Sequence, residues 1–103
     1  MSNFEIEKTL VASTFHASYT DVTFLESIAN YDQYSLNYPF WVEDCEYGVS
    51  IKLLSDFDLT KIGGLPLSDG LMELFIFCVS LGCSSLKLDV DGPTYDGFKK
   101  YDW

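Results

Sequence analysis

A long apolar segment near the C-terminus limits what this chain can fold into more than any other part of the sequence. Residues 71–81 are apolar at almost every position, which predicts a helix that is buried on most of its surface. Ser68 can cap this helix at its start, and Gly82 is a typical residue for its end. Residues 86–90 then alternate between apolar and polar side chains, which predicts a strand. A fold that buries both segments needs further elements around them.

The rest of the chain supplies those elements and predicts the fold class. Three further strands and one further helix give the order strand–helix–strand–strand–helix–strand, in a single domain over residues 1–103. This order predicts an α+β two-layer sandwich, with both helices on one face of a four-stranded sheet. A ferredoxin-like topology is the favoured arrangement, and a mixed four-stranded sheet with another strand order is the alternative. The expected elements are a strand over residues 6–13, a helix from Ser18 or Thr20 to about Asp32, and a hairpin of strands over 39–43 and 49–54.

The charge of the chain is strongly acidic and limits its partners. Sixteen Asp and Glu residues stand against six Lys and Arg residues, for a formal net charge of −10. Nucleic-acid binding needs a basic surface, so no direct contact with nucleic acid is expected. The same charge is repelled by anionic membranes, so no membrane partner is expected either. The expected partner is a protein with a basic surface.

The cysteines and the N-terminus indicate the compartment. The three cysteines have no spacing typical of a disulfide framework, which is the pattern of reduced thiols in a cytosol. The N-terminus lacks the basic and apolar regions of a signal peptide, and the longest apolar run is too short to cross a bilayer. The sequence therefore predicts a cytoplasmic protein, and no cofactor is expected.

Carboxylates outside the helices are concentrated in the predicted hairpin turn and in the loop that follows the hairpin. Carboxylates spaced along a surface can imitate a phosphate backbone and steer association with a basic partner. Tyrosine adds apolar area with a polar tip, which suits interfaces. The alternative is an acidic face that only keeps the protein in solution. The partner-binding surface is predicted at Glu43, Asp44, Glu46, Tyr47, Asp56 and Asp58.

Two carboxylates at the end of the last strand form a second candidate site. Asp89 and Asp91 are two residues apart, so they point to the same side, and Asp96 can supply a third oxygen ligand for a divalent cation. The favoured interpretation is an ordinary acidic turn, because Asp and Gly are common turn residues. A small metal-dependent enzyme or metal-binding domain is the alternative function that this pair allows.

The single histidine is a third candidate. His16 follows Ser13 and Thr14 at the end of the first strand, where it can act as a general base or hydrogen-bond to a loop. The second role is favoured, since no nucleophile motif accompanies it. If the first and last strands are parallel neighbours, His16 and the Asp89–Asp91 pair share one edge; in a ferredoxin-like sheet they lie at opposite ends.

Two blocks of the sequence, Leu10–His16 and Leu81–Pro93, together with the closing Tyr-Asp-Trp, resemble a family of small uncharacterised bacterial proteins. This domain of unknown function occurs on plasmids, prophages and other mobile elements. The resemblance implies a cytoplasmic accessory protein, and an inhibitor of a nucleic-acid-handling host protein is the function that it suggests. The family pattern marks Ser13, Thr14, His16, Asp89, Asp91, Tyr101 and Trp103.

These observations favour a non-enzymatic, acidic protein-binding module of a bacterial mobile element. The metal-dependent domain is the alternative. A homodimer through a sheet edge or through the aromatic C-terminal tail is a third hypothesis. The tail itself, with Phe98, Tyr101 and Trp103, is expected to fold back on the sheet or a helix, because these rings together are too apolar to remain in water.

Overall fold

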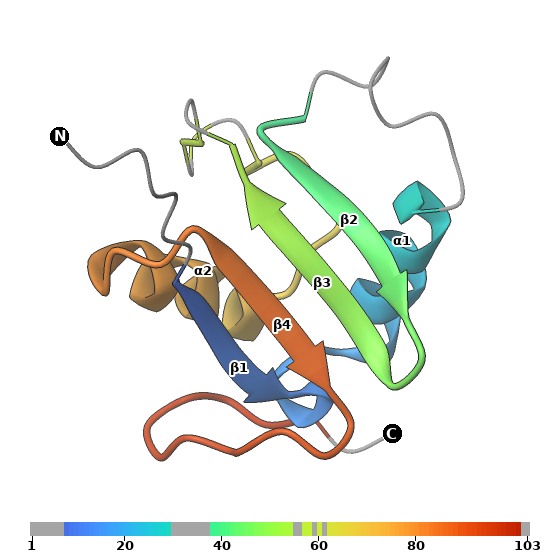
Figure 1. The fold of residues 1–103 in the computed structure, drawn as a ribbon, viewed down its shortest axis with the longest axis vertical. Helices are drawn as coiled ribbons and strands as arrows, with labels where there is room; N and C mark the ends of the chain where they lie inside the picture. Colours follow the sequence, from blue (N-terminus) through green and yellow to red (C-terminus); the bar gives the residue numbers. More distant parts are fainter. Residues whose placement is uncertain (1–7, 30–37, 55–56, 59, 61, 102–103) are drawn as a thin grey trace, which may run out of the picture.

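A four-stranded sheet forms one layer of the structure, and two helices cover one of its faces (Figure 1). The computed structural model describes residues 8–29, 38–54, 57–58, 60 and 62–101. The expected order of elements is confirmed within these residues. The elements are β1 (Thr9–Ser13), the short 3₁₀ helix η1 (Thr14–His16), α1 (Tyr19–Ala29), β2 (Phe40–Cys45), β3 (Gly48–Leu53), α2 (Asp69–Ser80) and β4 (Ser85–Asp89).

The sheet has the strand order β1-β4-β3-β2 and mixed directions. β1 and β4 are parallel, whereas β4 with β3 and β3 with β2 are antiparallel. The ferredoxin-like topology is not found, and the mixed sheet is the arrangement observed. Both topologies share one order of elements, and they differ in which strand stands beside β1. In this protein β4 inserts between β1 and β3, so β1 becomes an edge strand.

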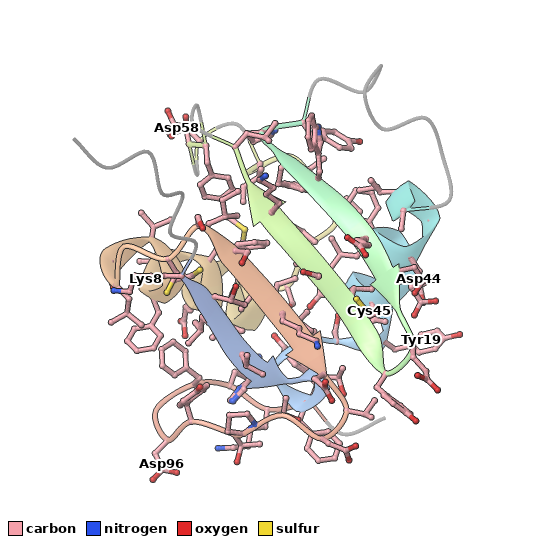
Figure 2. The ribbon with its side chains drawn as sticks, viewed as in Figure 1. Lys8, Tyr19, Asp44, Cys45, Asp58 and Asp96 are labelled. Atoms are coloured by element: carbon pink, nitrogen blue, oxygen red, sulfur yellow. The ribbon has the colours of Figure 1, made fainter. Side chains whose placement is uncertain are left out.

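The C-terminal residues protect the edge that this strand order leaves on β1. The Ser13 N–H donates to the Pro93 carbonyl (2.7 Å), and the Tyr95 hydroxyl donates to the Val11 carbonyl (2.6 Å). Unpaired edge groups are a template for unwanted strand pairing, so a covering segment is a common way to block them. At the other side of the sheet, β2 ends with Asp44 and Cys45 (Figure 2), and Glu46 and Tyr47 form the turn that leads into β3.

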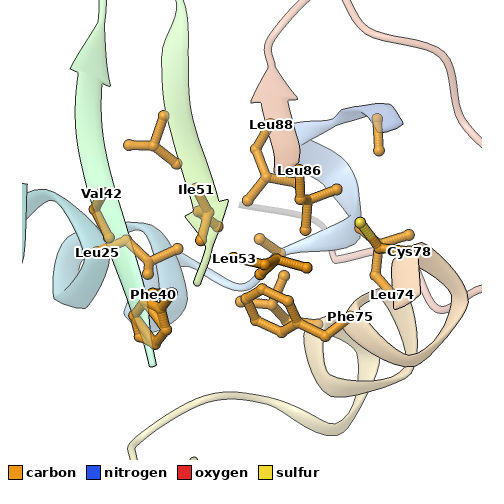
Figure 3. Packing of buried hydrophobic residues seen from close by; sticks show 14 of the residues in the cluster. Leu25, Phe40, Val42, Ile51, Leu53, Leu74, Phe75, Cys78, Leu86 and Leu88 are labelled. Atoms are coloured by element: carbon orange, nitrogen blue, oxygen red, sulfur yellow. The ribbon is translucent and has the colours of Figure 1, made fainter. Parts of the chain in front are cut away.

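The core lies between the sheet and the two helices, as the alternation of the strands predicts (Figure 3). Alternate side chains of every strand point toward the helices and are buried there. Aromatic rings extend this core, with the rings of Phe40 and Phe75 stacked at 6.3 Å and those of Phe57 and Phe75 at 5.7 Å. The fully buried centre includes Ala12, Leu25, Val49, Ile51, Leu71, Leu74, Phe75, Leu86 and Leu88.

The second helix starts and stops where its sequence signals predict. The Ser68 side chain accepts from the Leu71 N–H, so it caps the helix at its N-terminus. At the other end Gly82 adopts a φ of 75°, and the N–H groups of Gly82 and Cys83 donate to the carbonyls of Val79 and Cys78. This pair of bonds is a Schellman motif, which needs a residue that tolerates positive φ. No helix among the described residues is long and apolar enough to cross a membrane.

One buried carboxylate joins the N-termini of both helices. Asp21, in the first turn of α1, has no exposed surface. Its Oδ2 accepts from the N–H of Ser18 (2.8 Å) and from the hydroxyl of Ser68 (2.5 Å), while its Oδ1 accepts from the N–H of Ser68 (2.7 Å). In return the Ser18 hydroxyl accepts from the Asp21 N–H (3.1 Å), which completes a capping box. The negative charge also lies at the positive end of two helix dipoles.

We expect Asp21→Ala to lower the free energy of unfolding by about 2–4 kcal/mol, because it leaves three donors without their acceptor at two helix ends. Urea denaturation followed by circular dichroism measures this change. Asp69→Ala is the matched control: Asp69 also lies in a first helical turn but is exposed, so its loss is expected to cost at most about 0.5 kcal/mol. An equal loss of unfolding free energy in the two variants would contradict the role of Asp21 in joining the two helix N-termini.

A second buried polar group is the thiol of Cys78, which lies in α2. Its sulfur donates to the Ser85 carbonyl at 3.4 Å. Burial raises the pKa of Cys78 to about 12, and the neighbouring Cys83 thiol adds to this effect. In the unfolded chain a cysteine loses its proton near a pKa of about 8.5. Between these values the unfolded state binds fewer protons than the native state, so this group makes the protein less stable as the pH rises above about 8.5.

We therefore expect the free energy of unfolding of the wild-type protein to exceed that of Cys78→Ala by less at pH 10 than at pH 7. Urea denaturation of both proteins at each pH isolates the titration of this one thiol, because every other group is common to the two. In the native wild-type protein a thiol reagent at pH 8.5 should modify Cys78 only when the chain unfolds. An advantage that stays constant or grows with pH would contradict the buried, protonated thiol.

Candidate functional site

The mixed sheet brings most of the predicted site residues to one end. β1 and β4 both end there, and the turn of the β2–β3 hairpin lies beside them, because Ser13 pairs with Asp89 and Asp89 pairs with Gly48. We call this the hairpin end of the sheet. The parallel neighbours β1 and β4 therefore place η1 and the residues after β4 at one edge, an arrangement that the favoured ferredoxin-like prediction excluded.

A shallow groove of about 430 Å³ lies at the hairpin end, and we call it the hairpin-end groove. Three carboxylates line it, one from the end of β2, one from the hairpin turn and one from α1. Its apolar surface comes from Val22 and Val90. A positively charged ligand would be attracted into a concave surface of this kind, because its low-dielectric walls focus the electric field of the carboxylates. The polar lining includes Thr14, Glu26, Asp44, Glu46 and Tyr47.

Large apolar side chains are exposed at the rim of this groove. The Tyr47 side chain is 56% exposed and that of Val90 is 53% exposed, and both line the groove. Phe15, which follows the groove residue Thr14, is 52% exposed. Tyrosine and phenylalanine are enriched in the buried parts of protein interfaces. The hairpin end therefore combines carboxylates with apolar contact area.

The other predicted partner-binding residues do not join this groove. Glu43 is exposed on β2 and Asp58 lies at the opposite end of the sheet, beyond β3 (Figure 2). Asp58 accepts from the Thr60 N–H at 3.0 Å. Asp56 lies outside the described residues. The acidic surface expected from the sequence is thus divided between two ends, and only its hairpin part forms a concave site.

His16 is buried and both of its ring nitrogens are engaged. The Tyr95 N–H donates to Nε2 (2.9 Å), so this nitrogen carries no proton. The proton is on Nδ1, which donates to the Lys99 carbonyl (2.9 Å). A neutral imidazole held in this way has no nitrogen left to accept a proton from a substrate. The interpretation of His16 as a hydrogen-bonding residue that holds a loop is confirmed.

The loop that His16 holds is the C-terminal strap, residues 93–101. Besides its bonds to β1, the strap is fixed at its end by Tyr101, whose N–H donates to the Phe15 carbonyl (2.6 Å). The Tyr101 hydroxyl accepts from the N–H of Gly70 in α2 (3.1 Å), and a Cβ at position 70 would come within 2.8 Å of that hydroxyl. The ring of Phe98 packs on Phe77 at 5.0 Å. The expected folding back of the tail is confirmed for Phe98 and Tyr101, while Trp103 lies outside the described residues.

The Asp89–Asp91 pair forms a turn in this structure. Asp89 Oδ1 accepts from the Asp91 N–H (2.8 Å), and Asp89 Oδ2 lies 3.9 Å from Lys87 Nζ. Asp96 is in the strap, away from the hairpin end (Figure 2). Among the residues that the structure describes, no group of three His, Cys, Asp or Glu side chains is arranged to hold a metal ion. Metal binding at Asp89 and Asp91 stays a prediction without a third described ligand.

Two important residues, Glu26 and Asp21, were not predicted from the sequence. Glu26 contributes to the groove from α1, one helical turn after Val22, which also lines it. Their spacing of four residues places them on one face of the helix, a signal that is visible only once the helix is known to lie beside the hairpin. Asp21 was not singled out either, although Ser18 and Asp21 have the spacing of a capping box.

The chain belongs to the family of unknown function DUF5983, as its C-terminal domain, because the model of that domain matches residues 9–103. No curated protein and no solved structure matches the chain. The resemblance to a domain of unknown function is therefore confirmed. Of the positions marked by the family resemblance, His16 and Tyr101 hold the strap through hydrogen bonds and Ser13 does so through its backbone.

We expect His16→Ala to release the strap, because it removes the acceptor of the Tyr95 N–H and the donor to Lys99. The amide of Tyr95 should exchange at least about tenfold faster, and the free energy of unfolding should fall by about 2–3 kcal/mol. Hydrogen exchange resolved by NMR measures the first effect. Tyr101→Phe removes one hydroxyl at the end of the strap, so it should cost about 1 kcal/mol and leave the Tyr95 amide protected. Unchanged exchange of Tyr95 in His16→Ala would contradict the assigned role.

Proposed function

We propose that this member of the DUF5983 C-terminal domain family binds a basic segment of a partner protein in the hairpin-end groove. One observation carries the proposal: Glu26, Asp44 and Glu46, from two separate elements, line a single concave surface. A groove of about 430 Å³ has room for one or two long cationic side chains, such as those of lysine or arginine. Their charges would meet the carboxylates, and their methylene groups would meet Val22 and Val90.

The exposed rim supports a protein ligand over a small cation. Tyr47, which lines the groove, and Phe15, which follows the groove residue Thr14, offer exposed apolar area, and aromatic faces attract cationic side chains. A partner that inserts a basic residue into the groove can cover these rings at the same time. The net charge of −10 would speed the encounter with such a partner, and this contribution falls as salt concentration rises.

We propose further that the partner is a nucleic-acid-handling protein and that this chain inhibits it. The surface of such a protein is built to hold phosphates, and carboxylates at the hairpin end can occupy the same positions. In this proposal the chain is a non-enzymatic, cytoplasmic product of a bacterial mobile element. The engaged nitrogens of His16 support a binding role over a catalytic one.

The test is affinity capture from bacterial lysate with the tagged chain, at low and high salt, with bound proteins identified by mass spectrometry. We expect a nucleic-acid-handling protein that is retained at low salt and shed at high salt. Asp44→Lys combined with Glu46→Lys should abolish its retention, because the double change reverses the charge of the groove. Both residues are surface positions, so circular dichroism should show an unchanged fold.

The matched control changes the net charge equally without touching the groove. Asp58→Lys combined with Asp96→Lys also removes two negative charges and adds two positive ones, at the far end of the sheet and in the strap (Figure 2). This variant should retain the partner with an affinity within about threefold of the wild-type value, since only long-range attraction is reduced. If the two double variants lose the partner equally, net charge is responsible and the groove is not the binding site.

A further inference from the structure

The outward face of α2 carries an apolar stripe. Ile76 is 51% exposed and Val79 is 47% exposed, and the half-buried Met72 lies one turn before Ile76. A helix that covers a sheet normally presents polar residues to water. The intervals of four and three residues from Met72 to Ile76 to Val79 are those of a helix–helix seam. The stripe is therefore suited to pack against another helix.

An apolar hollow adjoins the stripe at the C-terminal end of α2. This hollow has a volume of about 260 Å³, and Val79 belongs to both the stripe and the hollow. It lies between α2, the end of β3 and the segment before β4. Its described lining is mostly apolar and includes Leu54, Phe57 and Cys83. A helix seated on the stripe would have space for its own side chains here.

Charges of opposite sign lie at the two ends of this helix. Asp69 and Glu73 are exposed in its first turns. Lys8 lies at its C-terminal end, where Nζ donates to the Leu81 carbonyl at 3.0 Å. The order along the helix is thus acidic, apolar, basic. A surface with this order is complementary to itself when one copy is turned end to end.

We propose that the α2 face binds a second copy of this chain, with the two α2 helices antiparallel about a twofold axis. When Ile76 packs against Val79 of the second copy, antiparallel counting places Glu73 opposite position 82 of that copy. Position 82 directly follows Leu81, whose carbonyl holds Lys8. Glu73 thus lies level with the Lys8 end of the other copy's helix, and in this proposal the two long side chains pair there, twice in one dimer. This proposal is independent of the hairpin-end groove.

The dimer is weak. The exposed parts of Ile76 and Val79 and the hollow supply much less than the roughly 800 Å² per partner of a standard interface. Two copies with a net charge of −10 also repel each other. We expect self-association only at protein concentrations on the order of 0.1–1 mM, with salt reducing the overall repulsion.

The first experiment uses two charge-reversal variants and sedimentation equilibrium up to about 1 mM. Lys8→Glu and Glu73→Lys should each remain monomeric alone, because each places like charges opposite one another. An equimolar mixture should form dimers, since both contacts then join opposite charges again. If either variant alone dimerises as strongly as the mixture, the proposed pairing of Lys8 with Glu73 is wrong.

The second experiment tests the stripe. Ile76→Gln keeps a good helix former and should weaken the association constant by about tenfold. Val11→Thr is the control, because Val11 is exposed on β1, away from α2. A wild-type chain that is monomeric at every concentration, or a dimer that Ile76→Gln leaves unchanged, would overturn the proposal. A dimer that Val11→Thr disrupts instead would assign association to the sheet.

Discussion

The fold depends on a single buried carboxylate that holds two helices together at their N-termini. Asp21 accepts from Ser18 within its own helix and from Ser68, which lies 47 residues further along the chain. An unpaired buried charge is strongly unfavourable, but this charge accepts three hydrogen bonds and faces the positive ends of two helix dipoles. The same contact therefore caps α1, positions the cap of α2 and fixes where both helices lie on the sheet.

The hairpin-end groove is built on this framework by residues that never enter it. His16 and Tyr101 hold the C-terminal strap, and the strap begins three residues after Val90, which lines the groove. Gly92 packs against the backbone of β1, where a Cβ would lie 2.6 Å from the Ala12 carbonyl oxygen. These contacts fix the path of the chain after β4 and thereby place one wall of the groove. His16 and Tyr101, which the family pattern marks, thus have an architectural role.

Local signals in the sequence were enough to predict the elements but not their arrangement. Ser68 and Gly82 predicted the limits of α2, because a cap and a left-handed stop act within a few residues. The strand order depends on which neighbour β4 pairs with, and the alternation of Leu86 and Leu88 is the same in either topology. The sequence also grouped Asp58 with Asp44, because both are carboxylates close to one predicted hairpin. In the structure Asp44 lies near the end of β2 and Asp58 follows β3, so the length of β3 separates them. Glu26 reaches the groove because α1 packs on β2 and β3, so its place in the site could not be predicted from the sequence alone.

The two proposed surfaces lie on different parts of the molecule and can be occupied together. The hairpin-end groove is formed by α1, the hairpin turn and the start of the segment after β4, whereas the stripe is on the outward face of α2. A dimer through α2 would therefore leave both grooves open and present two acidic sites in fixed relation. Two weak sites that engage one partner, or neighbouring copies of it, bind far more tightly than either alone, because the second contact becomes intramolecular. A small acidic domain with a modest groove could reach effective inhibition of a basic surface in this way, without a large interface in either copy.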